Sequence, residues 1–328
     1  MIRRPAIVAA LACALALPGA AHAQLPTGPP PTVKPPKDAR MDIALRSGRV
    51  DRKTRWILSG DKLLVKGHIW PFVKGQQVRI DLYRSGKVIG HRVVKVQRDK
   101  TRKNAGKYQY RFSIKDDGKY TVVARHKGNL AQGEGKSEKE HARAIPGSVR
   151  GEESTRLLQI SLRSLAFVSP LNGSLDDATR RAVLAYRKVN GWDRTGSPTP
   201  TVFRRVFNGR GRYKLRHTSP SKHVEADLSR QVIVLVDHKK PQQIYTMSSG
   251  KSSTPTVQGT FHFYRREPGA NSHGMYYSTY FYGGYAVHGY PSVPATYPAS
   301  HGCVRVPIPD AYRIYQSIDI GETIYVFS

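Results

Sequence analysis

Apolar and polar residues alternate with a period of two between residues 46 and 126. Such alternation is typical of strands that bury one face, because successive side chains of a strand point to opposite sides. Glycine-containing turns, for example at residues 116–119, separate the alternating runs. The pattern predicts a small antiparallel β-sandwich over residues 46–126, followed by a polar linker over 127–150. The alternating apolar residues include Val78, Ile80, Leu82, Tyr108, Tyr110, Phe112, Ile114, Tyr120 and Val122.

After residue 150 the apolar residues recur with the period of a helix. Three leucines are spaced i, i+4 and i+7, which places them on one helix face. A second apolar stripe follows a Ser-x-x-Asp capping box that begins at Ser174, and a third short run begins at Pro200. We therefore expect three short helices that form a self-contained module over residues 151–210. The leucines of the first stripe are Leu158, Leu162 and Leu165.

Residues 222–328 return to a β pattern. The apolar run 232–236 is uninterrupted, which is typical of a strand buried on both faces. A helix is expected at 310–317 and a last strand at 323–327. The whole pattern predicts a multidomain, mainly β fold with an N-terminal β-sandwich, a small three-helix module and a mostly β C-terminal domain.

The first 23 residues have the three parts of a secretory signal peptide. Arg3 and Arg4 precede an apolar run at 6–17, and Ala21-His22-Ala23 provides small residues at the cleavage site. The apolar run is too short for a membrane-spanning helix, and no later segment is apolar enough to be a transmembrane segment. A proline-rich linker is expected over 24–45. These features predict a protein secreted to the periplasm or cell wall.

The chain is strongly basic, with 54 Lys and Arg residues against 23 Asp and Glu residues and a formal net charge of +31. Such an excess indicates an anionic partner. For an exported protein, anionic cell-wall polymers are the expected partners, although solubility or a compositional bias towards arginine would also produce the charge. No zinc-ligand cluster or nucleic-acid-binding motif accompanies it, so no nucleic acid is expected as a partner.

The sequence contains two cysteines, and Cys13 lies in the predicted signal peptide. The mature protein would keep Cys303 alone, which therefore has no partner for an internal disulfide. A lone cysteine is often a small apolar filler. Cys303, however, follows Ser300, His301 and Gly302, and a second His-Gly pair, His288-Gly289, lies upstream. This context favours a nucleophile.

Thiols attack carbonyl groups as thiolates, so a cysteine nucleophile needs a base. Both His288 and His301 are candidates; His301 would share a strand face with Cys303 if residues 301–303 were extended. Backbone amides near Gly302 could stabilise an oxyanion. A zinc site built from His288, His301, Cys303 and His273 is an alternative, but structural zinc sites favour paired, short-spaced ligands. A papain-like peptidase would place its cysteine before its histidine.

The run from Ser300 to Arg305, together with His288-Gly289, resembles the active-site signature of the YkuD family of L,D-transpeptidases. Further similarity occurs at 227–231, at 254–261 and at 274–277. The resemblance covers residues 222–328 and implies a mostly β L,D-transpeptidase catalytic domain. It also implies that the enzyme forms peptidoglycan cross-links by acyl transfer from a tetrapeptide stem to an acceptor amine, with no metal and no organic cofactor.

The resemblance further implies a role for each motif residue. Cys303 would be the nucleophile and His288 its base, oriented through the backbone at Gly289. Gly302 and Cys303 would supply oxyanion donors, while Ser300 and His301 would shape the site. Arg305 would support the loop or bind a substrate carboxylate.

The other two regions also have resemblances. Residues 46–126 resemble immunoglobulin-like modules, and 151–210 resemble the peptidoglycan-binding three-helix module. The implied partners are peptidoglycan stem peptides and glycan. Two alternative functions remain open from the sequence: a non-catalytic cell-wall-binding or adhesion protein, and an L,D-carboxypeptidase that uses water as the acceptor.

Overall fold

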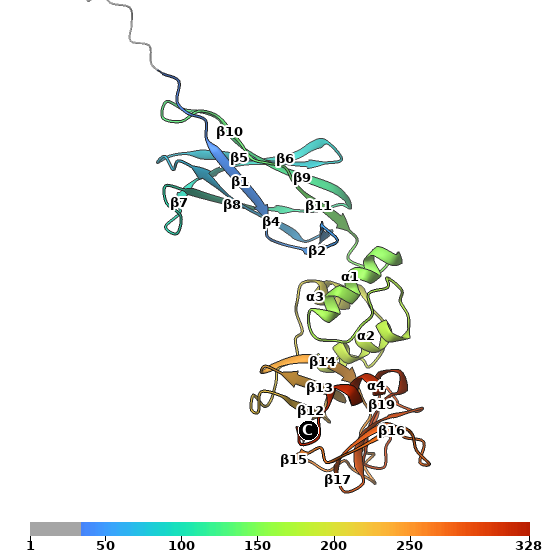
Figure 1. Cartoon of the computed structure of the whole chain (residues 1–328). Helices are drawn as coiled ribbons and strands as arrows, with labels where there is room; N and C mark the ends of the chain where they lie inside the picture. Colours follow the sequence, from blue (N-terminus) through green and yellow to red (C-terminus); the bar gives the residue numbers. More distant parts are fainter. Residues whose placement is uncertain (1–33) are drawn as a thin grey trace, which may run out of the picture. The chain divides into compact units, whose positions relative to one another are not determined.

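A computed structural model describes residues 34–328 (Figure 1). Its N-terminal part consists of two β-sheets. The first has the strand order β1-β4-β8-β7 and the second the order β2-β3-β11-β9-β5-β6, with β10 paired to β9. The strands of the first sheet are β1 (Arg40–Leu45), β4 (Lys62–Trp70), β7 (Gln97–Arg98) and β8 (Gly106–Ser113). Those of the second are β2 (Arg49–Asp51), β3 (Thr54–Leu58), β5 (Gln77–Arg84), β6 (Lys87–Lys95), β9 (Gly118–His126), β10 (Gly135–Lys136) and β11 (Glu140–Ile145).

The alternating apolar residues of these strands form one hydrophobic core. Leu63 and Val65 of β4 pack in a cluster with Ile80 of β5 and Val122 of β9, and all four side chains are fully buried. Burying each such side chain is worth about 1.5–3 kcal/mol. The period-two pattern thus selects which face of each strand is withdrawn from water, and the predicted β-rich N-terminal region is confirmed.

The sandwich extends beyond its predicted limits at both ends. Strand β1 lies within the predicted linker 24–45, and β11 lies within the predicted linker 127–150. Strand β11 is antiparallel to β9 and parallel to β3, so it is an inner strand of its sheet. Its inward residues Ala142 and Ala144 are small and give a weak apolar signal. The predicted signal peptide and the first part of the proline-rich linker lie outside the described residues.

Three helices follow, as the apolar stripes predicted: α1 (Gly151–Arg163), α2 (Asp177–Val189) and α3 (Pro200–Phe207). Asp176 is the N-cap of α2, and its carboxylate accepts a hydrogen bond from the Thr179 amide at 2.8 Å. The N-cap therefore lies two residues after the predicted cap, Ser174, and the helix begins at Asp177. Thr199 caps α3, with Pro200 in the first turn.

The helices do not enclose a core of their own. Leu162, Tyr186 and Phe203 belong to the same buried cluster as Val234 of β13 and Ile244 of β14. A separate three-helix module over 151–210 is therefore not confirmed, because the core of the helices is shared with β13 and β14 and with Trp56 and Leu58 of β3. Sequence periodicity identifies the apolar face of a helix but not the element that covers it.

The C-terminal part has two sheets and one helix. The five-stranded sheet has the order β14-β13-β12-β20-β15, and the four-stranded sheet has the order β16-β17-β18-β19. Its elements are β12 (His223–Asp227), β13 (Val232–Asp237), β14 (Lys240–Thr246), β15 (Gly259–His262), β16 (Arg265–Ala270), β17 (Tyr276–Tyr282), β18 (Tyr285–Tyr290), β19 (Val304–Pro307), α4 (Ile308–Ser317) and β20 (Thr323–Phe327). The apolar run at 232–236 is buried along its whole length, as predicted.

A single cluster joins the two C-terminal sheets to α4. It includes Val224 of β12, Phe281 of β17, Val304 of β19 and Ile314 of α4. This core packs the four-stranded sheet against α4 and so fixes the positions of β18 and β19. Within residues 34–328, no helix has the length and apolarity needed to cross a membrane.

Candidate functional site

The predicted site residues lie where β18 and β19 run side by side. These strands are parallel, with His288 opposite Arg305 and Val287 opposite Val304. Opposite residues of paired strands present their side chains on the same face. Cys303 immediately precedes β19, so the sheet brings it beside β18 although a long loop separates the two strands in sequence.

His288 is a buried, neutral base. Its side chain is 2 % exposed, and its Nδ1 lies 2.9 Å from the Gly289 carbonyl oxygen. A carbonyl oxygen can only accept, so Nδ1 carries the proton and Nε2 is left as an acceptor. Burial, aided by the charge of Arg305, lowers the pKa of His288 to about 4, although the bond to Gly289 acts in the opposite direction. The imidazole is therefore neutral at pH 7.

Cys303 is a partly exposed thiol held in its protonated form. Its Sγ donates to the carbonyl oxygen of Gly284 at 3.7 Å. Burial raises the pKa of the Cys303 thiol, although a hydrogen bond from the Ala286 backbone and the charge of Arg305 act against this rise. The site therefore contains a neutral thiol and a neutral imidazole, rather than a preformed ion pair.

The backbone before Cys303 is fixed by Ser300. This side chain is fully buried; its hydroxyl donates to the Cys303 carbonyl oxygen at 2.6 Å and accepts from the Gly302 amide at 3.0 Å. Both contacts fix the backbone of the loop that carries Cys303. The Gly302 amide is thereby engaged within the loop, so of the two predicted oxyanion donors it is the less available one.

Gly302 is required at its position for two reasons. Its φ is +114°, in a region that side chains with a Cβ rarely adopt, and an added Cβ would lie 2.3 Å from a ring carbon of Tyr285. Because the chain turns there, β19 begins only at Val304. His301 consequently lies in a bend and is exposed. The expectation that His301 and Cys303 share a strand face is therefore wrong.

Gly289 allows α4 to approach β18. A Cβ on Gly289 would lie 2.7 Å from the Ala311 Cβ, so a larger residue would push the helix away.

Arg305 makes two contacts beside the site. Its Nη1 donates to the Ala299 carbonyl oxygen at 3.2 Å, and its guanidinium lies 3.8 Å from the centre of the Tyr290 ring. These contacts hold Arg305 against the loop that precedes Cys303.

A hydrogen-bonded chain that the sequence reasoning missed connects helix α2 to this loop. Lys188 of α2 is 2 % exposed, and its Nζ donates to Thr246 Oγ1 at 2.6 Å, to the Met247 carbonyl oxygen at 3.0 Å and to the Gln231 carbonyl oxygen at 3.2 Å. No carboxylate lies within 4 Å of Nζ among residues 34–328. Burial, aided by the charge of Arg194, lowers the pKa of Lys188 to about 7.

The chain continues through the side chain of Gln231. Its Oε1 accepts from the Ser249 amide at 2.9 Å, and its Nε2 donates to Ser249 Oγ at 2.7 Å. The carbonyl oxygen of Ser249 then accepts from the Ser300 amide at 2.9 Å. Only one sequence signal pointed to Lys188: it lies three residues after Ala185, on a buried helix face. The contacts themselves are long-range and have no local pattern.

We expect Lys188 to make the free energy of unfolding rise with pH. Its pKa is about 7 in the folded state against an ordinary value of 10.5, so the unfolded chain binds more protons between these values. Stability therefore increases as pH rises through this window, by about 2 kcal/mol between pH 7.5 and 9. Urea unfolding at the two pH values, followed by tryptophan fluorescence, measures this increase.

The matched control is Lys188→Met, which keeps the length of the side chain and removes the titrating group. Its free energy of unfolding is expected to change much less over the same pH interval. An equal increase in both proteins would show that other groups are responsible.

The described residues 34–328 place no three His, Cys, Asp or Glu side chains close enough together to hold a metal ion. In particular, His273 does not join His288, His301 and Cys303 in a common ligand set. The zinc alternative thus lacks a donor set in this part of the chain.

Comparison with known proteins decides the family. The family model of the L,D-transpeptidase catalytic domain, YkuD, matches residues 221–326. The crystal structure of the L,D-transpeptidase from Xylanimonas cellulosilytica is similar to this chain at 31% sequence identity and a TM-score of 0.50, covering 56% of this chain and 97% of that one. The chain belongs to the YkuD family of L,D-transpeptidases.

Other solved members of the family are more distant. The L,D-transpeptidase of Stackebrandtia nassauensis is 22% identical, covers 54% of this chain and 92% of its own, and has a TM-score of 0.35. An L,D-transpeptidase from Mycobacterium tuberculosis is 21% identical, covers 33% of this chain and 58% of its own, and has a TM-score of 0.30. None of the curated proteins matches the chain. The YkuD domain makes this an L,D-transpeptidase-type enzyme of a family that acts on peptidoglycan.

Proposed function

We propose that the protein forms peptidoglycan cross-links by acyl transfer through Cys303. The observation that carries this proposal is the neutral, buried His288, whose Nδ1 is committed to Gly289 on the strand that runs beside Cys303. Such a histidine is a proton acceptor with one free nitrogen and a fixed orientation. The family membership supports the peptide stem of peptidoglycan as the substrate.

In the first half-reaction, the thiol proton moves to Nε2 of His288 as Sγ attacks the carbonyl carbon at the L-centre of the third stem residue. A carbon–sulfur bond forms, the peptide bond to the terminal D-alanine breaks, and the leaving amine takes the proton from the imidazolium. The product is a thioester on Cys303. The low pKa of His288 makes its imidazolium a strong acid, so it readily protonates the leaving amine.

In the second half-reaction, the amine of a neighbouring stem attacks the thioester. Nε2 of His288 accepts a proton from this amine, a new amide bond forms, and the carbon–sulfur bond breaks. The sulfur recovers its proton from the imidazolium. Atoms and charge balance over the cycle without a metal or an organic cofactor, and water in place of the amine would give the carboxypeptidase reaction.

The charge of Arg305 supports both half-reactions. The guanidinium acts to lower the pKa of both Cys303 and His288, so it favours the thiolate of Cys303 and the neutral imidazole of His288. It therefore stabilises a thiolate or an oxyanion as negative charge develops on the sulfur or on the carbonyl oxygen. Since Arg305 is anchored to Ala299 and Tyr290, this charge needs little rearrangement during the reaction.

We further propose that the protein is exported and works in the periplasm or cell wall. The predicted signal peptide over 1–23 and the net charge of +31 support this location, where anionic polymers are available as partners. Cell fractionation with an antibody against the protein would test it. Recovery of the full-length chain in the cytosol, with the first 23 residues retained, would refute it.

Mass spectrometry of peptidoglycan fragments tests the proposed reaction. The protein lacking residues 1–23 is incubated with disaccharide-tetrapeptides, and we expect release of D-alanine and formation of cross-linked dimers. Tetrapeptides that remain unchanged, with a protein whose Cys303 still reacts with iodoacetamide, would contradict the proposal. Release of D-alanine without dimers would instead identify the carboxypeptidase.

We expect the alkylation rate of resting Cys303 to keep rising through pH 9. The thiol pKa is raised above its ordinary value, so the thiolate fraction is small at neutral pH and grows only in alkaline solution. Iodoacetamide labelling followed by intact-protein mass measures this rate. A rate that reaches a plateau below pH 7 would indicate a preformed thiolate–imidazolium pair and would contradict the neutral resting state.

A further inference from the structure

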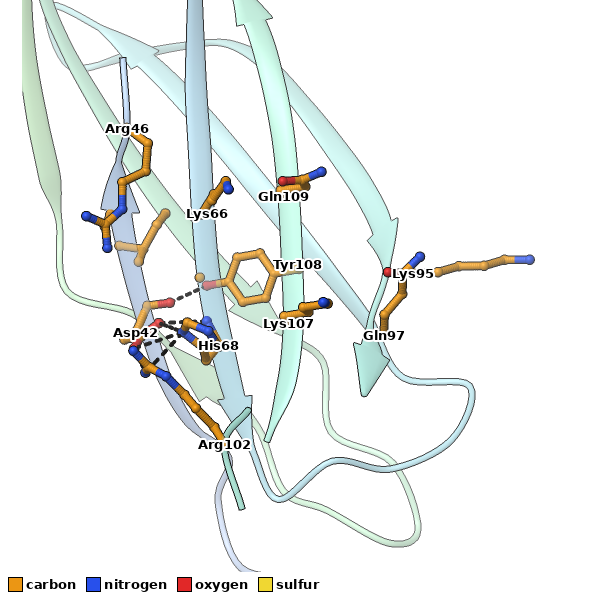
Figure 2. Close-up of a pocket in the computed structure, with 13 residues that line it drawn as sticks. Asp42, Arg46, Lys66, His68, Lys95, Gln97, Arg102, Lys107, Tyr108 and Gln109 are labelled. Carbon is orange, nitrogen blue, oxygen red and sulfur yellow. Dashed lines mark hydrogen bonds and ion pairs between the residues drawn. The ribbon is translucent and has the colours of Figure 1, made fainter. Parts of the chain in front are cut away.

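The outer face of the first sheet of the sandwich carries a basic groove of about 620 Å³ (Figure 2). We define the basic groove by its charged lining residues, which come from β1, β4, β8, the segments next to these strands and the end of β6. Five are cations and one is a carboxylate: Arg46, Lys66, Lys95, Arg102, Lys107 and Asp42. No residue of the L,D-transpeptidase site contributes to it.

Strand register places the groove residues in rows. His68 of β4 is opposite Asp42 of β1 and also opposite Lys107 of β8. In the next row, Lys66 of β4 is opposite Gln109 of β8. Neighbouring strands are about 4.8 Å apart, so these side chains project from one face at close spacing.

The positive charge of the groove is only partly neutralised within the protein: besides Asp42, the buried Asp99 lies 3.2 Å from Nε2 of His68. Asp42, its one carboxylate, is already engaged by His68 Nδ1 at 3.0 Å and by Arg102 at 3.5 Å. Among residues 34–328, none of Lys66, Lys95 and Lys107 has a carboxylate within 4 Å, and all three are exposed. Adjacent like charges repel, and a bound anion would relieve that repulsion.

The sheet under the groove is locked in shape. On its inner side, the buried Tyr108 of β8 crosses β4 at Gly67 and donates to the Asp42 carbonyl oxygen of β1 at 2.5 Å. A Cβ on Gly67 would lie 2.4 Å from the Tyr108 hydroxyl oxygen, so only glycine permits this crossing. Three strands are thereby tied together, which lowers the entropy cost of binding a ligand on their outer face.

The uncharged groups of the groove indicate the type of anion. The amides of Gln97 and Gln109 lie among the cations and are exposed, so they can donate to and accept from hydroxyl groups. Of the two rings of the lining, Tyr108 is buried, and His68 is held by Asp42 and Asp99 and packs against Trp70, so the groove offers little ring surface for stacking a nucleic-acid base. Ile43 is buried as well, and no exposed apolar side chain is available for insertion into a membrane.

We infer that the basic groove binds an anionic polysaccharide, whose repeated carboxylate or phosphate groups contact the lysines while its hydroxyl groups contact the two glutamine amides. The site would hold the enzyme on a charged polymer through a surface separate from its reaction centre. This inference does not depend on the proposed acyl transfer.

Fluorescence anisotropy with labelled polymers tests the groove. The protein lacking residues 1–23 is titrated into polygalacturonate, which carries carboxylates, and into poly(glycerol phosphate), which carries phosphates. The groove variant is K66E/K107E, and the matched control K87E/K115E changes the net charge equally at exposed lysines of the same sandwich outside the groove. We expect at least about a tenfold rise in Kd for the groove variant and less than about threefold for the control. The polymer that binds more tightly identifies the acid group.

A second variant separates glycan recognition from simple charge attraction. Q97A/Q109A is expected to weaken polymer binding about threefold or more while leaving its salt dependence unchanged, because no charge is lost. Several outcomes would overturn the inference: equal weakening by both lysine pairs, no binding of either polymer by the parent protein, or tighter groove-dependent binding of DNA or of anionic vesicles. Circular dichroism of each variant confirms that these exposed substitutions leave the fold intact.

Discussion

Cys303→Ala is expected to abolish release of D-alanine from tetrapeptides while the protein stays folded. The thioester cannot form without Sγ, and the residual rate should fall by at least about 10³-fold. The fold is expected to tolerate the change, because Sγ is partly exposed and bonds only to the backbone of Gly284, at 3.7 Å, and of Ala286. The expected cost in the free energy of unfolding is about 1 kcal/mol. Released D-alanine and the thermal unfolding temperature are the two measurements.

Cys303→Ser is the companion variant, since it keeps the size of the side chain and replaces the sulfur by a much weaker nucleophile. We expect it to lose activity as well. D-alanine release at the parent rate by either variant would eliminate the covalent mechanism. Unfolding of both variants would instead assign Cys303 a structural role that its partial exposure does not suggest.

His288→Gln is expected to reduce the rate constant of D-alanine release by about 10²–10⁴-fold, the usual contribution of a positioned general base. Glutamine keeps much of the volume and can still donate to the Gly289 carbonyl oxygen, but it has no nitrogen that takes up a proton at neutral pH. The loss should fall on kcat rather than on KM, because His288 acts on the proton rather than on substrate binding. Steady-state kinetics with a tetrapeptide substrate give both constants.

The control for His288→Gln is His301→Ala. His301 is exposed and lies in a bend, so its removal should change kcat by no more than a few-fold. If His301→Ala lost activity and His288→Gln kept it, the exposed histidine would be the base and the tautomer argument would fail.

Local patterns in the sequence predicted the parts of the fold that depend on local chemistry. The period-two alternation identified the β-rich N-terminal region, and the uninterrupted run at 232–236 identified a strand buried on both faces. The pattern failed for β11, whose inward residues Ala142 and Ala144 differ too little from a polar segment. It located the three helices but not the surface that covers them, because the covering surface of a helix is a property of the tertiary structure.

In the candidate site, too, some features were predicted from local sequence patterns and others depend on tertiary structure. The sequence predicted Cys303 and His288 as site residues because a lone thiol close to two histidines favours a nucleophile with its base. The parallel pairing of β18 with β19 brings their positions together. The course of the backbone at Gly302 could not be read from the sequence, and His301 was consequently placed on the wrong surface. The link from Lys188 through Gln231 to Ser300 depends on residues far apart in the chain, which no periodicity connects.

The neutral state of Cys303 also bears on its chemical lifetime. Peroxide and related oxidants attack thiolates and react slowly with thiols. The first product is a sulfenic acid, and its further oxidation to sulfinic and sulfonic acids is irreversible. A side chain whose proton is held towards Gly284, in surroundings that raise its pKa, offers such oxidants little to attack. In the proposed mechanism, the thiol would become vulnerable mainly during turnover, when its proton has moved to His288, and the resting enzyme would keep its sulfur reduced even in an oxidising environment.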